Sequence, residues 1–75
     1  MVTIEGKIQR LGISTPTWII TTRDGKSYEI FPGAPPGLLQ AGMLVRVRGE
    51  LRTDVPSVAM IGAVIEVKSF ELVFP

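Results

Sequence analysis

The 75-residue chain contains no Cys and no His. The absence of Cys excludes disulfides, thiol nucleophiles and Cys-based zinc sites. The absence of His removes the side chain that most often serves as general base and metal ligand. The seven Asp and Glu residues mostly alternate with basic residues, a pattern typical of solvated ion pairs on strands. We therefore expect a non-enzymatic protein with no catalytic residue, no cofactor and no metal ion.

Long apolar runs are also missing. No segment approaches the roughly 18 consecutive apolar residues of a membrane-spanning helix. Charges interrupt Val2–Lys7, where a signal peptide would need an unbroken apolar stretch. The sequence thus predicts a soluble, unprocessed protein without a membrane partner, and we expect it in the cytoplasm, a compartment compatible with the lack of Cys. A formal net charge of +1 gives no strong long-range attraction to nucleic acid.

What the chain does contain is a series of short segments that alternate apolar and polar residues, punctuated by eight Gly and six Pro. A period of two places the apolar side chains on one face of a strand. The predicted strands are Val2–Gln9, Thr17–Thr22, Lys26–Phe31, Met43–Arg52 and Val64–Val67. We expect one all-β domain over residues 1–75, folded as a small five-stranded barrel. Gly6, which lacks a Cβ, allows the sharp coil of a first strand that belongs to both halves of such a barrel.

The turn Arg23-Asp24-Gly25 sets the register of a hairpin. If Asp24-Gly25 formed a two-residue turn, the apolar side chains would be divided between two faces. With a three-residue loop and Gly25 in the left-handed bulge position, Thr22 faces Lys26 and the apolar groups gather on one face. We predict this second register. The residues that it buries are Trp18, Ile20, Tyr28 and Ile30, together with Val45 and Val47.

Pro and Gly residues exclude a central strand over Pro32–Gly37. About one helical turn is expected over Leu38–Gln40, with Gly42 ending it. Apolar residues after position 69 are out of phase with those of Val64–Val67, which predicts a bulge near Lys68-Ser69. Further loops are predicted over Gly12–Pro16 and Thr53–Gly62.

The stretch Leu44–Arg52, followed by Ser57–Gly62 and Ile65–Val67, resembles that of short uncharacterised bacterial proteins of OB-fold-like design. Five strands, a coiled first strand, a tight hairpin between the second and third strands and a longer connection after the third fit this architecture. The resemblance implies a fold and no functional motif. OB-folds usually place a full helix in the long connection, where this chain has room for one turn only, so an SH3-like small barrel remains the alternative.

The candidate phosphate-contact residues are Arg46, Arg48 and Arg52. Alternate residues of a strand lie about 7 Å apart on one face, close to the spacing of phosphates in an extended single strand. The alternative is a neutralised stripe, because Glu50 interrupts it and Glu5 or Glu66 on neighbouring strands can pair with it.

Large apolar side chains remain on the outer face and at the C-terminal end. In the predicted register Ile19 and Phe31 point outward beside Glu29, a poor platform for stacking bases. Residues 70–74 carry four large hydrophobic side chains, which we expect to pack across the barrel as an extra strand or to pair with a second copy. The candidate interface residues are Ile19, Phe31, Phe70, Leu72 and Phe74.

The sequence therefore favours a non-catalytic binding or assembly module that acts through protein contacts, as a homo-oligomer or with another protein. Weak, sequence-tolerant binding of single-stranded nucleic acid is the alternative.

Overall fold

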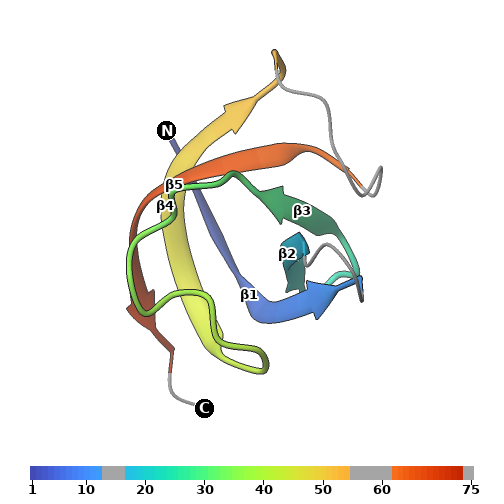
Figure 1. Cartoon of the computed structure of the whole chain (residues 1–75), viewed down its shortest axis with the longest axis vertical. Coiled ribbons are helices and arrows are strands. Elements are labelled where there is room, and N and C mark those ends of the chain that lie inside the picture. Colours follow the sequence, from blue (N-terminus) through green and yellow to red (C-terminus); the bar gives the residue numbers. More distant parts are fainter. Residues whose placement is uncertain (13–16, 55–61, 74–75) are drawn as a thin grey trace.

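The computed structural model describes residues 1–12, 17–54 and 62–73 of the chain. Its strands are β1 (Val2–Leu11), β2 (Thr17–Thr22), β3 (Ser27–Ile30), β4 (Leu44–Arg52) and β5 (Val64–Leu72). Figure 1 shows these strands wrapped around a common centre. The predicted loops at 12–16 and 53–62 lie mostly outside the described residues. Within the described residues there is no helix, and hence none long and apolar enough to cross a membrane.

The strands form one closed barrel in the order β1-β2-β3-β5-β4. All neighbouring strands are antiparallel except β3 and β5, which run parallel and, within the described residues, pair at Glu29–Val64 and Ile30–Ile65. A five-stranded barrel with this crossover is OB-fold-like, as the sequence predicts, and it favours that architecture over the SH3-like alternative.

β1 is the strand that closes the barrel, because it pairs with β2 on one edge and with β4 on the other. The two pairings overlap at Gly6 and Lys7, and the partners of Gly6 are Thr22 and Val45. A Cβ at position 6 would lie 2.4 Å from the backbone oxygen of Thr21. The predicted need for a glycine at this coil is therefore confirmed, and the close approach of the β2 backbone is its cause.

The hairpin between β2 and β3 has the predicted register. Ile20 pairs with Tyr28, and the Thr22 amide donates a 2.8 Å hydrogen bond to the Lys26 oxygen. Gly25 has φ 90°, the left-handed conformation expected for the last residue of a three-residue loop. Ile20 and Ile30 consequently point into the core of the barrel, and Trp18 and Tyr28 pack against it.

The predicted bulge in β5 is also present. Arg48 pairs with Ser69 whereas Gly49 pairs with Val67, so Lys68 is the extra residue. The bulge brings Phe70 opposite Val47, where it packs against the core. Residues up to Leu72 therefore continue β5 and pair with β4 of the same chain.

The core is a single cluster of aliphatic side chains that fills the barrel: Ile4, Ile8, Ile20, Ile30, Leu38, Val45, Val47, Ile65 and Val67. Trp18 and Tyr28, which the sequence analysis placed among the buried residues, are only half-buried and pack against the edge of this cluster. Trp18 pairs with exposed Arg10 near the end of β1, which leaves its ring incompletely covered.

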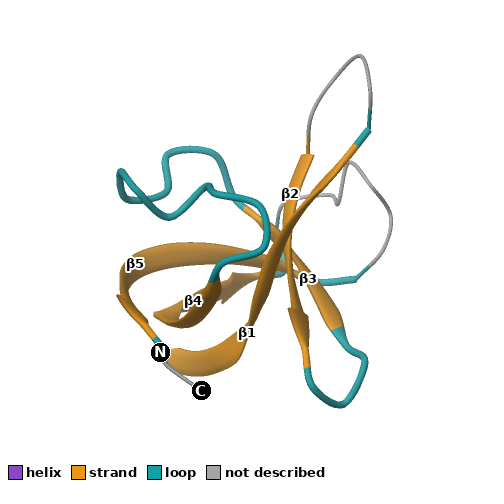
Figure 2. Ribbon diagram, turned by 90° about the horizontal axis from the view of Figure 1, so that it is seen from below, coloured by secondary structure: helices purple, strands orange, loops and turns teal. Residues whose placement is uncertain are grey.

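The connection from β3 to β4 spans residues 31–43 and lies alongside β5 in both views (Figures 1 and 2). The expected helical turn over Leu38–Gln40 is wrong. The Leu38 amide donates to the Pro35 oxygen and the Gln40 amide to the Leu38 oxygen, so short turns replace the hydrogen bonds of an α-helix. This geometry drives Leu38 into the barrel, where none of its surface is exposed.

Candidate functional site

The predicted apolar interface residues do not form one exposed patch. Phe70 packs against the core, and Phe31 is half-buried with the Arg52 guanidinium 5.1 Å from its ring centroid, a cation–π distance. Leu72 is 49% exposed at the end of β5. Phe74 lies outside the described residues. Of the five candidates, Leu72 is the described residue with substantial free apolar surface.

Ile19 is the fifth candidate, and the expectation that it is exposed is wrong. It points away from the core cluster, yet only 4% of its surface is accessible. Its cross-strand partner Glu29 is 5% exposed, and Val64, which pairs with Glu29 on the other side, is 2% exposed. The outer face of β2 and β3 is thus buried at Ile19, Glu29 and Val64. Alternation of apolar and polar residues along a strand predicts one buried face only, so it predicts exposure here.

Arg46 lies on the outer face of β4 between two carboxylates. Its Nε and Nη2 donate hydrogen bonds of 3.1 and 2.9 Å to Glu5 Oε2, and its Nη1 donates one of 2.9 Å to Glu71 Oε1. These carboxylates, Glu71 first and then Glu5, raise the pKa of Arg46. The three residues face one another because β1 and β5 flank β4, so the guanidinium joins three strands.

Arg52 is held in a similar way at the other end of β4. Its Nε and Nη2 donate to both oxygens of Asp54, at 3.0 and 2.9 Å, and its Nη1 donates to Glu66 Oε1 at 3.0 Å. The Arg52 guanidinium lowers the pKa of Asp54 to about 2. Hydrogen bonds from Arg52 and then from Lys68 also lower the pKa of Glu66. Arg52 is therefore committed to carboxylates of its own chain and to the Phe31 ring.

Arg48 lies between the other two arginines and makes no ion pair within the described part of the chain. Two of the three candidate phosphate contacts, Arg46 and Arg52, are thus neutralised by carboxylates. Their partners include Glu5 and Glu66, the residues on neighbouring strands that the sequence analysis named. A continuous cationic track along β4 is absent from this face of the described residues. The neutralised stripe is the interpretation that the ion pairs support.

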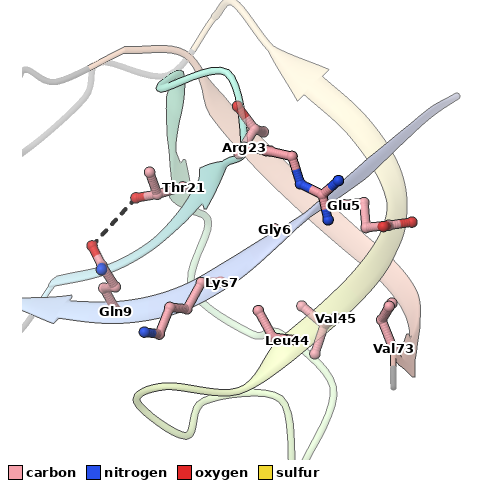
Figure 3. Close-up of a pocket in the computed structure, with 10 residues that line it drawn as sticks. Glu5, Gly6, Lys7, Gln9, Thr21, Arg23, Leu44, Val45 and Val73 are labelled. Atoms are coloured by element: carbon pink, nitrogen blue, oxygen red, sulfur yellow. Dashed lines mark hydrogen bonds between the residues drawn. The ribbon is translucent and has the colours of Figure 1, made fainter. Parts of the chain in front are cut away.

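A groove that the sequence did not predict crosses β1 beside Gly6, with a volume of about 530 Å³ (Figure 3). It lies where β1 leaves β2 and turns onto β4, and the β2–β3 hairpin forms one rim. The residues that line it are Glu5, Gly6, Lys7, Gln9, Thr21, Thr22, Arg23, Leu44, Val45 and Val73.

The groove combines aliphatic surface with two cations. Leu44 is 42% exposed and pairs with Lys7 of β1, while the Val73 amide donates to the Leu44 oxygen at 3.0 Å. Lys7 and Arg23 form no ion pair within the described residues. Figure 3 shows them on opposite sides of the β1 ribbon, with Arg23 reaching from the hairpin.

The remaining polar groups of the groove are engaged within the chain. Glu5 accepts two hydrogen bonds from Arg46, and the Thr21 hydroxyl donates to Gln9 Oε1 at 3.3 Å. Asp24, next to Arg23 at the hairpin tip, accepts a hydrogen bond from the Thr22 hydroxyl, which lowers the pKa of Asp24. The groove thus offers free positive charge and apolar contact area.

Sequence reasoning missed this site because four separate segments build it: β1, the β2–β3 hairpin, the start of β4 and the residue after β5. Lys7 and Leu44 were recognisable only as outward positions of two alternating strands. That they are neighbours depends on the β1–β4 register, which local pattern does not reveal.

No cluster of three or more Asp or Glu suited to a metal ion is found within the described residues. Comparison of the chain with protein-family models, with curated proteins and with solved structures finds no match. The residues of the chain and their arrangement are therefore the basis for assigning a function.

Proposed function

We propose that the protein is a non-enzymatic binding module that holds a segment of a partner protein in the groove across β1. The observation that carries this proposal is that exposed Leu44 and half-buried Val73 line the same groove as Lys7 and Arg23, two cations with no ion-pair partner among the described residues. Ligand sites in proteins are typically concave, with apolar contact area and a few polar groups that fix orientation.

Single-stranded nucleic acid is the second class of ligand, and two features favour protein over it. Sequence-tolerant single-strand sites rely on aromatic rings to stack bases, and none of the described residues that line the groove is aromatic. Two of the three arginines proposed to contact phosphates, Arg46 and Arg52, are bound by carboxylates of the same chain, which leaves Arg48 isolated between them.

The test is selection of binders from a displayed library of peptides about ten residues long, the extended length that spans a barrel 31 × 28 × 26 Å across. Selected peptides are then titrated into the intact protein and into two variants, Leu44→Asn and Leu51→Asn. These leucines lie on the same strand and are 42% and 41% exposed, and only Leu44 lines the groove.

We expect Leu44→Asn to weaken peptide binding at least about fivefold, as loss of a contact worth roughly 1 kcal/mol would do. Leu51→Asn should leave it within about twofold. Selected peptides that bind both variants equally, or a selection that yields no binder, would contradict the proposal.

A further inference from the structure

The charged residues of the groove and the distances between its side chains indicate which class of protein segment fits it. This inference rests on the proposed function. We infer that the groove selects an extended acidic segment in which an apolar residue follows an acidic residue two positions along, on the face that contacts the barrel.

The charged residues of the groove favour an acidic ligand. The lining residues include two cations, Lys7 and Arg23, and one carboxylate, Glu5. Glu5 already accepts two hydrogen bonds from Arg46, so it is not available to an incoming basic group. Lys7 and Arg23 have no such partner within the described residues. A carboxylate on the ligand could therefore pair with Lys7 and Arg23. Repulsion from Glu5 would be weak, because Arg46 compensates its charge.

The spacing comes from the strand register. Lys7 of β1 pairs with Leu44 of β4, and Val73, the residue after β5, is hydrogen-bonded to Leu44, so the three are successive neighbours across the groove. Adjacent strands lie about 4.8 Å apart, so the boundary between Leu44 and Val73 lies about 7 Å from Lys7. In an extended peptide, residues i and i+2 point to the same side and are also about 7 Å apart. An acidic residue over Lys7 thus places the residue two positions along over the two aliphatic side chains.

Arg23 supplies the second acidic contact. It stands on the hairpin rim, across β1 from Lys7 (Figure 3). A segment that crosses β1 would pass both cations, which favours a second acidic residue. A basic or neutral segment would leave both cations without a partner, so the same contacts reject it.

The probe is a fluorescein-labelled peptide of about ten residues with the repeat Glu-Thr-Val-Thr, which presents Glu and Val alternately on one face. Its matched controls replace every Glu by Gln or by Lys. Binding to the intact chain is followed by fluorescence anisotropy at about 0.05 M and 0.5 M NaCl, because contacts between exposed charges weaken with salt.

Two double variants test which cations of the protein contact the acidic peptide. Lys7→Glu with Arg23→Glu reverses the groove cations, whereas Arg10→Glu with Arg48→Glu reverses two exposed cations outside it. Each double variant lowers the net charge of +1 by four, so long-range attraction changes equally. Far-UV circular dichroism and the urea midpoint verify that each variant is folded.

We expect the Glu peptide to bind at least about tenfold more tightly than the Gln peptide at low salt, with the Lys peptide weaker still. Reversal at Lys7 and Arg23 should weaken the Glu peptide at least about tenfold, and reversal at Arg10 and Arg48 by no more than about threefold. Equal binding of the Glu and Gln peptides, or equal loss in both double variants, would overturn the inference.

The two proposals fail differently. If selected library peptides are weakened by Leu44→Asn but the Glu peptide has no advantage over the Gln peptide, the groove binds and its preference for acid is refuted. If the selected library peptides bind the Leu44→Asn variant as tightly as the intact protein, the groove is refuted as a binding site. A fluorescein-labelled oligo(dT) of about ten nucleotides completes the set. Tighter binding of this oligonucleotide than of the Glu peptide, lost on reversal of Lys7 and Arg23, would replace the peptide by single-stranded nucleic acid.

Discussion

Replacement of Leu38 tests the role of the β3–β4 connection most directly. The Leu38 side chain is wholly covered inside the barrel, whereas its neighbour Leu39 is 37% exposed. Leu→Ala at a buried site costs about 2–5 kcal/mol, the larger values where the surroundings cannot relax. An irregular loop relaxes more readily than a strand, so we expect about 2–3 kcal/mol for Leu38→Ala. Small proteins have a free energy of unfolding of roughly 0.05–0.15 kcal/mol per residue, which gives about 4–11 kcal/mol for the 75-residue chain.

The assay is urea unfolding followed by the fluorescence of Trp18, the only Trp in the chain. With an m-value of about 1 kcal/mol/M, Leu38→Ala should lower the midpoint by roughly 2 M. Leu39→Ala is the matched control and should cost less than about 1 kcal/mol. Equal losses for Leu38→Ala and Leu39→Ala would mean that Leu38 does not fill the barrel, and the account of this connection would be wrong.

Three further predictions concern the strands and their ion pairs. Gly6→Ala should lower the free energy of unfolding by about 2 kcal/mol or more in the same urea assay, because its Cβ meets the β2 backbone; an unchanged midpoint would refute the close approach. The pKa values of Asp54 and Glu66 are lowered in the folded chain, so the stability that they add is present above their ordinary pKa values and is lost as the pH falls from about 4.5 toward 2. The urea midpoint should fall over this range, and Arg52→Gln should make the fall shallower; an equally steep fall in that variant would contradict the pairing. Sedimentation of the intact chain over a wide concentration range should show a monomer, since β5 is paired within the chain through Leu72, whereas a dimer that Leu72→Glu dissociates would establish self-association.

Much of the fold follows from local sequence signals. The turn at Gly25, the phase change at Lys68 and the glycine at position 6 each impose a backbone geometry that few other residues tolerate, so their structural consequences are readable along the chain. Neutralisation of Arg46 and Arg52 was also foreseeable, because carboxylates occur at outward positions of the predicted neighbouring strands.

The features that sequence reasoning missed depend on non-local contacts. Leu38 and Leu39 are identical residues in an irregular segment, and only the path of the loop decides which one enters the barrel. Ile19 occupies an outward position by strand alternation, and its burial reflects coverage of that face rather than its own strand. The groove depends on β1–β4 register, which relates residues more than thirty positions apart, such as Lys7 and Leu44. Periodicity within one strand carries no information about any of these.

The parallel seam between β3 and β5 is narrow, with two residue pairs among the residues that the structure describes. β1, β2 and β3 form an antiparallel meander, and β4 and β5 form an antiparallel pair, so each unit is built from neighbours in sequence. Closure of the barrel joins these two units through distant residues, and such non-local pairing is slow, typically on the millisecond-to-second scale. If the seam forms last, substitutions such as Ile30→Val and Ile65→Val should accelerate unfolding and leave the folding rate nearly unchanged in stopped-flow measurements. The seam would then set the lifetime of the closed barrel, while the two antiparallel units set the rate at which it forms.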